Sequence, residues 1–180
     1  MRLEEQIKNI ADREQIPVVL KQHNLFNKVC EVGVNVGNQF RYYYSFNPEI
    51  LVGVDLFKGK WGRKIKDLSV YMETIQKDCP KSILEKGISW KIANKYQDNY
   101  FDFVYIDANH KYKSIKKDLD AWFPKVKKGG VLAGHDYTAR RGYGVIQAVT
   151  KFAAKYNCPV YLTTSGTLTQ KPWKSWIIVV

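Results

Sequence analysis

Short apolar runs that alternate with amphipathic helical stretches limit most strongly what this chain can fold into. Apolar runs at Lys28–Val32, Ile50–Val54 and Phe101–Ile106 each end at a polar or glycine-containing turn. Segments with helical spacing of apolar residues, Val36–Ser45 and Tyr112–Phe123, lie between or after them. Strands separated by helices form right-handed crossover units. The pattern therefore predicts an α/β fold with a mostly parallel sheet and helices on both faces.

The remaining elements follow from the same periodicity. We expect further helices at Arg2–Asp12, Pro17–Leu25, Ser69–Lys77 and Gly144–Tyr156, and further strands at Ile88–Ala93, Val131–Gly134, Val160–Thr164 and Ser175–Val180. The last strand is expected to be antiparallel. The basic, glycine-containing stretch Phe57–Lys66 is expected to be a loop. In such a sheet, functional side chains gather at the carboxyl ends of the strands.

Length and cysteine usage favour one domain in a reducing compartment. The 180 residues amount to about one domain, which we divide into N-terminal helices (1–27) and an α/β core (28–180). No run approaches the roughly 18 apolar residues of a membrane span, and the N-terminus is too polar for a signal peptide. Cys30, Cys79 and Cys158 show no paired spacing, so we expect no disulfide framework or zinc site, and a cytoplasmic protein.

The chain is strongly basic, with 29 Lys and Arg against 17 Asp and Glu and a net charge of +12. Such an excess suggests an anionic partner or substrate. One cluster, from Lys111 to Lys117 with Lys125–Lys128, is expected to lie mainly on the solvent face of a helix. The other surrounds Trp61 in the stretch Phe57–Lys66. It could bind a phosphate or a nucleotide-sugar, or follow a nucleic-acid backbone.

A glycine turn follows the first apolar strand and opens a helix. Glu31–Gly37 reads E-x-G-x-x-x-G, whereas a dinucleotide turn usually reads G-x-G-x-x-G. An acid two residues before the first glycine suits a ligand with an ammonium group better than a pyrophosphate. Asp55, at the end of the next strand, is placed to accept hydrogen bonds from ribose hydroxyls. The turn therefore favours a nucleoside with a charged tail.

These residues resemble the S-adenosylmethionine (SAM) binding motifs of class I methyltransferases. The resemblance implies that Glu31 lies near the methionine amino group and that the turn lies under the methionine and ribose. Asn38 and Gln39 depart from the Ser or Thr that often follows the second glycine in this family. The implied cofactor contacts are Glu31, Gly33, Asn35, Gly37, Asp55, Leu56, Ala93 and Asn94 (at the adenine), and Asp107.

A second set of motifs lies in the C-terminal half. Asp107–Tyr112 reads D-A-N-H-K-Y, Asp118–Trp122 reads D-L-D-A-W, and Gly129–Tyr137 reads G-G-V-L-A-G-H-D-Y. Together they resemble a subfamily of small SAM-dependent O-methyltransferases, and the resemblance extends from about Val29 to the end of the chain. It implies a seven-stranded sheet with an antiparallel last strand. Members commonly methylate sugars or other small hydroxylated metabolites.

Methyl transfer to a hydroxyl needs orientation and a way to lower the pKa of that hydroxyl. His110 and His135 both fall at strand ends, and either could be the general base. Asp107 and Asp136 could share Mg²⁺ or another divalent cation. Other roles remain open, since Asp107 could contact the SAM amino group without a metal. His110 could cap the following helix, and His135 could bond a neighbouring loop.

The leading hypothesis is a SAM-dependent methyltransferase that O-methylates a small sugar-like or nucleotide-sugar-like metabolite, releasing S-adenosylhomocysteine. An acidic group on the acceptor could bind the basic residues near the site. The alternative is an RNA ribose methyltransferase that uses the basic surface. Acceptor recognition is expected from the N-terminal helices, the Phe57–Lys66 stretch, the Ala139–Tyr143 loop or a partner subunit in a homo-oligomer. We expect no membrane association.

Overall fold

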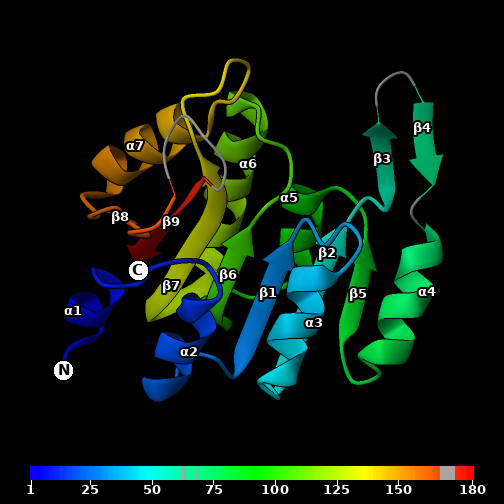
Figure 1. The fold of residues 1–180 in the computed structure, drawn as a ribbon, viewed down its shortest axis with the longest axis horizontal. Coiled ribbons are helices and arrows are strands. Elements are labelled where there is room, and N and C mark those ends of the chain that lie inside the picture. The colour runs from blue at the N-terminus through cyan, green and yellow to red at the C-terminus, as the bar shows by residue number, and fades with distance from the viewer. Residues whose placement is uncertain (62–63, 68, 167–172) are drawn as a thin grey trace.

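The central sheet of the computed structural model, which describes residues 1–61, 64–67, 69–166 and 173–180, has seven strands in the order β5-β2-β1-β6-β7-β9-β8 (Figure 1). All neighbouring strands pair in parallel except β9, which is antiparallel to both β7 and β8. The α/β prediction with an antiparallel last strand is confirmed. The strands are β1 (Lys28–Val32), β2 (Ile50–Asp55), β5 (Ile83–Lys86), β6 (Phe101–Ile106), β7 (Val126–Tyr137), β8 (Tyr161–Leu162) and β9 (Lys174–Val179).

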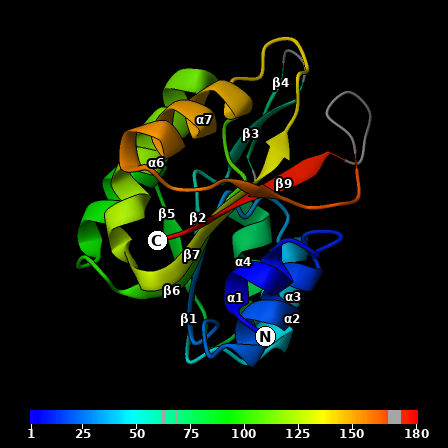
Figure 2. The same ribbon diagram turned by 90° about the vertical axis from the view of Figure 1, so that its left-hand side faces the viewer.

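Helices cover both faces of this sheet (Figure 2). One layer consists of α1 (Leu3–Ile7), α2 (Gln15–Gln22), α3 (Asn38–Ser45) and α4 (Ser69–Asp78). The other consists of α5 (Ser89–Ile92), α6 (Tyr112–Trp122) and α7 (Val145–Tyr156), with the 3₁₀ turns η1 (Ala93–Lys95) and η2 (Phe123–Lys125). Among the described helices, none has the length and apolar character needed to cross a bilayer.

Strand β6 shows why the sheet holds two cores. All six of its residues are buried. Phe103 and Tyr105 pack with the helices α1–α4, while Val104 and Ile106 pack with α5–α7, because successive side chains of a strand point to opposite faces. A strand that is apolar on both faces belongs in the middle of a parallel sheet. β6 therefore pairs with β1 on one side and β7 on the other.

The predicted strand Ile88–Ala93 is wrong. The strand lies earlier, at β5, and Ser89–Ile92 forms the short helix α5. β5 is an edge strand with Ile83 and Lys86 exposed, so its sequence lacks the apolar run typical of a buried strand. Ile88 and Ile92 are four residues apart, which suits one face of a helix, and Ile92 packs into the core.

The stretch Phe57–Lys66, expected to be a loop, contains an antiparallel pair of strands, β3 (Lys58–Trp61) and β4 (Lys64–Asp67). This pair stands apart from the main sheet and projects from the body (Figure 1). Because these strands do not cover the main core, they need no continuous apolar run, which is the signal by which the other strands were predicted. Arg63 of the basic cluster lies outside the described residues.

The N-terminal segment differs from the single helix predicted over Arg2–Asp12. α1 ends at Ile7, and the residues after it lie beside the segment that contains Thr164 and Ser165. The amide of Thr164 donates to the carbonyl of Ile10 at 2.9 Å, and the amide of Ser165 donates to the carbonyl of Ala11 at 2.8 Å. These bonds fix the segment that precedes α2 above the end of the sheet.

Candidate active site

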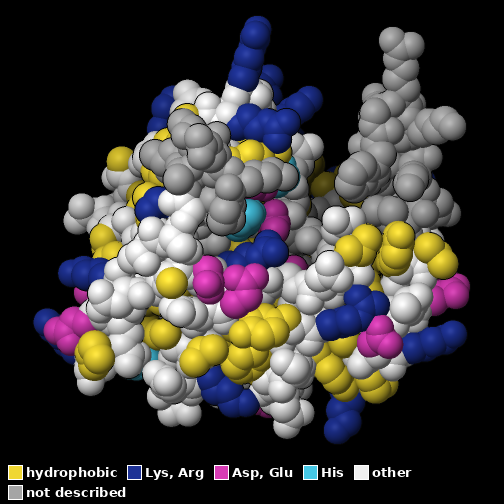
Figure 3. Space-filling view, viewed as in Figure 1, with side chains coloured by type: hydrophobic (Ala, Val, Ile, Leu, Met, Phe, Trp, Pro, Cys, Tyr) yellow, Lys and Arg dark blue, Asp and Glu magenta, His cyan; other side chains and the backbone are white. Residues whose placement is uncertain are grey.

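The carboxyl ends of the central strands open into two adjoining cavities, and acidic and histidine side chains lie together near the middle of the face seen in Figure 3. The first cavity has a volume of about 800 Å³ and the second about 920 Å³. Both are lined by Arg13, Asn35, Asp107 and His110. A ligand in one cavity would therefore adjoin a ligand in the other at these four residues.

The glycine turn after β1 forms the floor of the first cavity. Gly33 has a φ of +98°, and a Cβ there would overlap the backbone carbonyl of Asp107. The absence of a side chain thus lets the ends of β1 and β6 approach closely. Gly37, with a φ of +83°, is the N-cap of α3. The helix follows the turn as predicted, but Gly37, an implied cofactor contact, is not among the described residues that line the first cavity.

Asp55 is held with its carboxylate at the first cavity. Its Oδ2 accepts from the amide of Asn35 at 2.8 Å, and its Oδ1 accepts from the amide of Phe57 at 2.7 Å. Each carboxylate oxygen has a further lone pair, so the group can still accept hydrogen bonds from two adjacent hydroxyls. Leu56, which is half-exposed, also lines this cavity.

Glu31 is a buried carboxyl at the same cavity. It is 2% exposed, and its Oε2 has no hydrogen-bond partner among the residues that the structure describes. Burial and the nearby charge of Asp107 raise its pKa well above the usual range, while Arg13 acts in the opposite direction. A buried acceptor without a partner costs free energy, so this position suits a cationic ligand group that donates to it.

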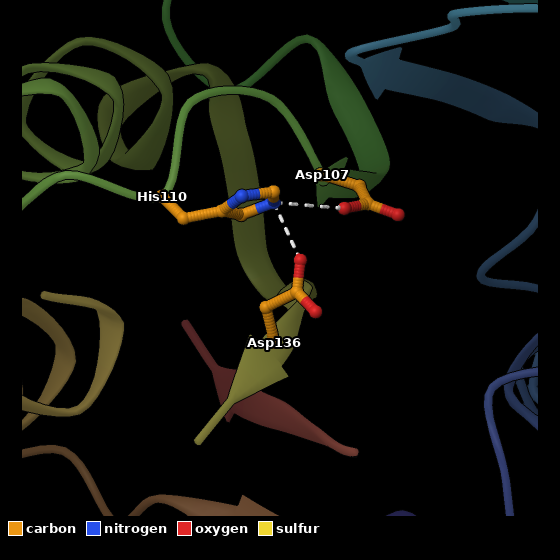
Figure 4. Close-up of side chains that lie close together, drawn as sticks. All are labelled: Asp107, His110 and Asp136. Atoms are coloured by element: carbon orange, nitrogen blue, oxygen red, sulfur yellow. Dashed lines mark ion pairs between the residues drawn. The ribbon is translucent and has the colours of Figure 1, made fainter. Parts of the chain in front are cut away.

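Asp107, His110 and Asp136 meet where the two cavities adjoin (Figure 4). His110 Nε2 lies 2.5 Å from Asp136 Oδ2 and 3.6 Å from Asp107 Oδ1. Burial opposes protonation of His110, but its contacts with the two carboxylates outweigh it and raise the pKa to about 9. Burial would raise the pKa of Asp136, yet His110 and His135 hold it well below its usual range.

The same three residues offer a ligand set for a metal ion. One ligand atom from each lies within 4.8 Å of the others. Two carboxylates and one imidazole suit a divalent cation such as Mn²⁺ or Mg²⁺. The sequence predicts Asp107 and Asp136 as ligands, and the structure adds His110 to them. Asp136 reaches this point from an irregular part of β7, where its φ is +55° and the pairing with β9 shifts register.

The second cavity has an aromatic wall beside the three residues. The ring of Tyr143 stacks on His110 at 4.8 Å between centroids, and the ring of Trp173 meets Tyr143 edge-on at 5.4 Å. The guanidinium of Arg140 lies over the rings of Tyr143 and Trp173. His135 lines the cavity with its Nδ1 3.2 Å from Asp136 Oδ1. Polar side chains complete the lining: Thr163, Ser165 and Ser175.

The resemblance implies that Ala93 and Asn94 contact the adenine, but the structure does not place either residue at the first cavity. Both belong to η1, and neither is among the described residues that line the first cavity. The segment that precedes α5 and begins it, Gly87–Trp90, lines the cavity instead. The difference follows from the strand error, because the strand end that faces the cavity is that of β5.

Several side chains that line the cavities were not predicted as site residues, and Arg13 and Asp118 are two charged examples. Arg13 lines both cavities, with its Nη1 3.6 Å from Asp107 Oδ2. Its position depends on the docking of the N-terminal segment, which leaves no local sequence pattern. Asp118, the first residue of the D-L-D-A-W motif, also lines the first cavity.

The basic cluster expected mainly on the solvent face of a helix lies there only in part, because Lys125 and Lys127 follow α6 and pair with Asp98 and Asp102. Lys111, Lys113, Lys116 and Lys117 are all exposed along α6. Of the cluster around Trp61, Lys58 lines the first cavity.

Comparison with known proteins places this geometry in a family. The sequence profile of a methyltransferase domain matches residues 30–137. No curated protein matches the chain in sequence.

Solved structures share the fold at low identity. An O-methyltransferase from Bacillus cereus in complex with SAH has a TM-score of 0.64 and 12% identity over 93% of this chain and 80% of its own. CalS11, a TDP-rhamnose 3′-O-methyltransferase of calicheamicin biosynthesis, has a TM-score of 0.59 and 17% identity over 93% of this chain and 81% of its own.

A spermidine synthase from Thermotoga maritima has a TM-score of 0.59 and 16% identity over 93% of this chain. This chain spans only 59% of that synthase. At these identities the likeness shows the fold, a Rossmann-like methyltransferase fold. The matched profile covers more than half of the residues, so the chain belongs to the methyltransferase-domain family.

Proposed function

We propose that this methyltransferase transfers a methyl group from SAM, bound in the first cavity, to a hydroxyl of a small acceptor in the second. One observation carries the proposal: the two cavities adjoin at Arg13, Asn35, Asp107 and His110. A donor and an acceptor held in them would meet at the side chains best suited to activate a hydroxyl. Orientation of this kind supplies much of the rate of a transfer between two bound molecules.

The residues of the first cavity fit the cofactor. The unpartnered Oε2 of Glu31, with Asp107 beside it, would hold the ammonium group of the methionine part. Asp55 would accept from the ribose hydroxyls, since Asn35 and Phe57 already fix its orientation. When bound, SAM supplies a methyl group on a cationic sulfur. The chain's task is to place that group beside the second cavity.

Asp107, His110 and Asp136 would lower the pKa of the acceptor hydroxyl. A divalent cation held by them would do so as a Lewis acid. His135 is then available as the base, because Asp136 faces its Nδ1 and leaves Nε2 to accept a proton. Without a metal, the close His110–Asp136 pair holds a proton itself, so His110 would be a poor base near neutral pH.

The second cavity favours a neutral, polyhydroxylated acceptor. Tyr143 and Trp173 offer apolar ring faces, and Asp12 and Glu14 add carboxylates at the side formed by the N-terminal segment. Carboxylates and hydroxyls accept hydrogen bonds from sugar hydroxyls. CalS11, whose fold this chain shares, is a sugar O-methyltransferase. A neutral sugar is therefore the acceptor class we propose.

The described part of the chain offers little support for RNA as the acceptor. The exposed lysines of α6 lie along a helix face, and Lys116 there pairs with Asp120 at 2.6 Å. The second cavity, by contrast, contains four carboxylates: Asp12, Glu14, Asp107 and Asp136. Such a lining repels a phosphate backbone.

The proposal is tested in two stages. Calorimetry with S-adenosylhomocysteine should detect binding, and absence of binding at millimolar ligand would remove the cofactor assignment. Methyl transfer from radiolabelled SAM is then measured with sugars, nucleotide-sugars, catechols and RNA as separate acceptors. Transfer to the RNA alone would replace the proposed acceptor class.

A further inference from the structure

Asp118 is a buried carboxyl at the first cavity that the proposed mechanism does not use. It is 1% exposed and lies on the inner face of α6. Its Oδ1 has no hydrogen-bond partner within the described parts of the chain, although the residue lines the cavity. Its neighbour Asp120, two residues later, is exposed and pairs with Lys116. A buried acceptor left unpaired beside a cavity indicates a ligand group that would pair with it.

The direction of the hydrogen bonds around Asp118 is fixed by Trp122. The indole Nε1 of Trp122 donates to Ser89 Oγ at 2.8 Å. An indole nitrogen can only donate, so Ser89 Oγ is the acceptor of that bond. The one hydroxyl proton of Ser89 is left for another acceptor, and Ser89 acts on the Asp118 carboxyl by lowering its pKa against the effect of burial. Ser89 and Trp122 thus lie on one side of Asp118, while its Oδ1 stays without a partner among the described residues and the residue lines the cavity.

Asp118 lies at the end of the cavity beyond the ribose position. The amide of Gly87 donates to the backbone carbonyl of Asp55 at 2.9 Å, so the segment that carries Ser89 begins next to Asp55. Trp90 lines the cavity beside Ser89, and Lys117 Nζ lies 4.7 Å from the centre of its ring. A nucleoside whose ribose is held by Asp55 and whose tail reaches Glu31 would direct its base toward this end.

We propose that Asp118 recognises the exocyclic amine of the adenine of the cofactor, so that the site accepts a 6-amino purine and rejects a 6-oxo purine. The inference rests on the proposed function and names a specificity-determining residue for it. An adenine amine would donate to Oδ1. A 6-oxo purine would place a carbonyl oxygen against the carboxylate, so two acceptors would face each other without a proton between them.

Burial raises the pKa of Asp118 to about 6, which leaves the group mainly ionised at pH 7.5. Measurements at that pH therefore compare purines against a carboxylate acceptor.

The test compares two ligands that differ only at this purine position. Calorimetry at pH 7.5 measures the affinities of S-adenosylhomocysteine and S-inosylhomocysteine for the unmodified chain, for Asp118→Asn and for Asp120→Asn. The unmodified chain should prefer the adenosyl ligand by at least roughly tenfold. Asp118→Asn should reduce that ratio below about threefold or reverse it, because an amide can donate to the 6-oxo group. Asp120→Asn, on the exposed side of the same helix, should keep the original ratio.

Thermal unfolding shows whether each variant is folded before binding is measured. Should Asp118→Asn not fold, Asp118→Ser removes the carboxyl with less bulk, and its ratio should also fall below about threefold. An unchanged ratio in a folded Asp118 variant, or no preference in the unmodified chain, overturns the inference. Failure of the unmodified chain to bind S-adenosylhomocysteine at all would instead contradict the proposed function.

Discussion

His110 Nε2 lies 2.5 Å from Asp136 Oδ2, and this contact joins the loop after β6 to the irregular end of β7. Asp136 lines only the second cavity, whereas His110 lines both. The pair therefore stands where an acceptor hydroxyl would face the methyl donor. We expect Asp136→Asn to reduce kcat by roughly 100-fold or more while the affinity for S-adenosylhomocysteine changes little. Steady-state kinetics and calorimetry check the two effects, and a parallel loss of ligand affinity would contradict this division of roles.

Removal of divalent cations tests the ligand set of Asp107, His110 and Asp136. If a cation is held there, EDTA should abolish turnover, and Mg²⁺ or Mn²⁺ should restore it. His110→Ala removes one of three ligands and should raise the cation concentration needed for half-maximal activity by roughly tenfold or more. The partly buried His23, which is the C-cap of α2 and contacts Gln6, provides the control His23→Ala. Full activity in EDTA would show that the carboxylates and His110 act without a metal.

Glu31→Gln should weaken the binding of S-adenosylhomocysteine without lowering the stability of the folded protein. The buried Oε2 of Glu31 has no partner within the described part of the chain, and burial raises the pKa of its carboxyl, so ionising it costs free energy in the empty protein. The amide variant should therefore unfold at the same temperature or a higher one. Its affinity for S-adenosylhomocysteine should fall by roughly 10- to 100-fold, because the amide lacks the negative charge that strengthens the bond to the ligand ammonium.

5′-Methylthioadenosine, which lacks the amino-acid part, is the control ligand for this variant. Its affinity should be the same for Glu31→Gln and the unmodified chain. An equal loss for both ligands would mean that the substitution disturbs the cavity as a whole.

The central strands could be predicted from the sequence because they are apolar on both faces. The structure gives β1 and β6 the predicted bounds, Lys28–Val32 and Phe101–Ile106. β5 could not be recognised in the same way, since an edge strand exposes residues such as Ile83 and Lys86 to solvent. Local apolar patterning therefore identifies the middle of this sheet and fails at its edge.

The candidate site likewise contains residues that could be predicted from the sequence and a residue that could not. Acidic residues at the ends of adjacent parallel strands, such as Asp107 and Asp136, could be expected to meet because the sheet order brings those ends together. Arg13 could not be expected there. Its place beside Asp107 depends on the hydrogen bonds by which Thr164 and Ser165 hold the N-terminal segment. Contacts between such distant segments follow from the finished fold.

Asp118 makes stability depend on pH. Burial raises its pKa to about 6 from the ordinary value of 3.8. Between these values the folded chain keeps a proton that the unfolded chain has released, so the free energy of unfolding falls as the pH rises. A difference of about two pKa units corresponds to a loss of about 3 kcal/mol, complete above pH ~7. In Asp118→Asn this dependence should be absent.

Urea unfolding of the two proteins between pH 4 and pH 7.5 measures the effect. Other groups, including Glu31 and His110, also have shifted pKa values, but they are present in both chains and their contributions cancel in the difference. The variant should therefore gain stability relative to the unmodified chain as the pH rises. Parallel curves over this range would mean that Ser89 and the surrounding helix ends stabilise the ionised carboxyl as well as water does.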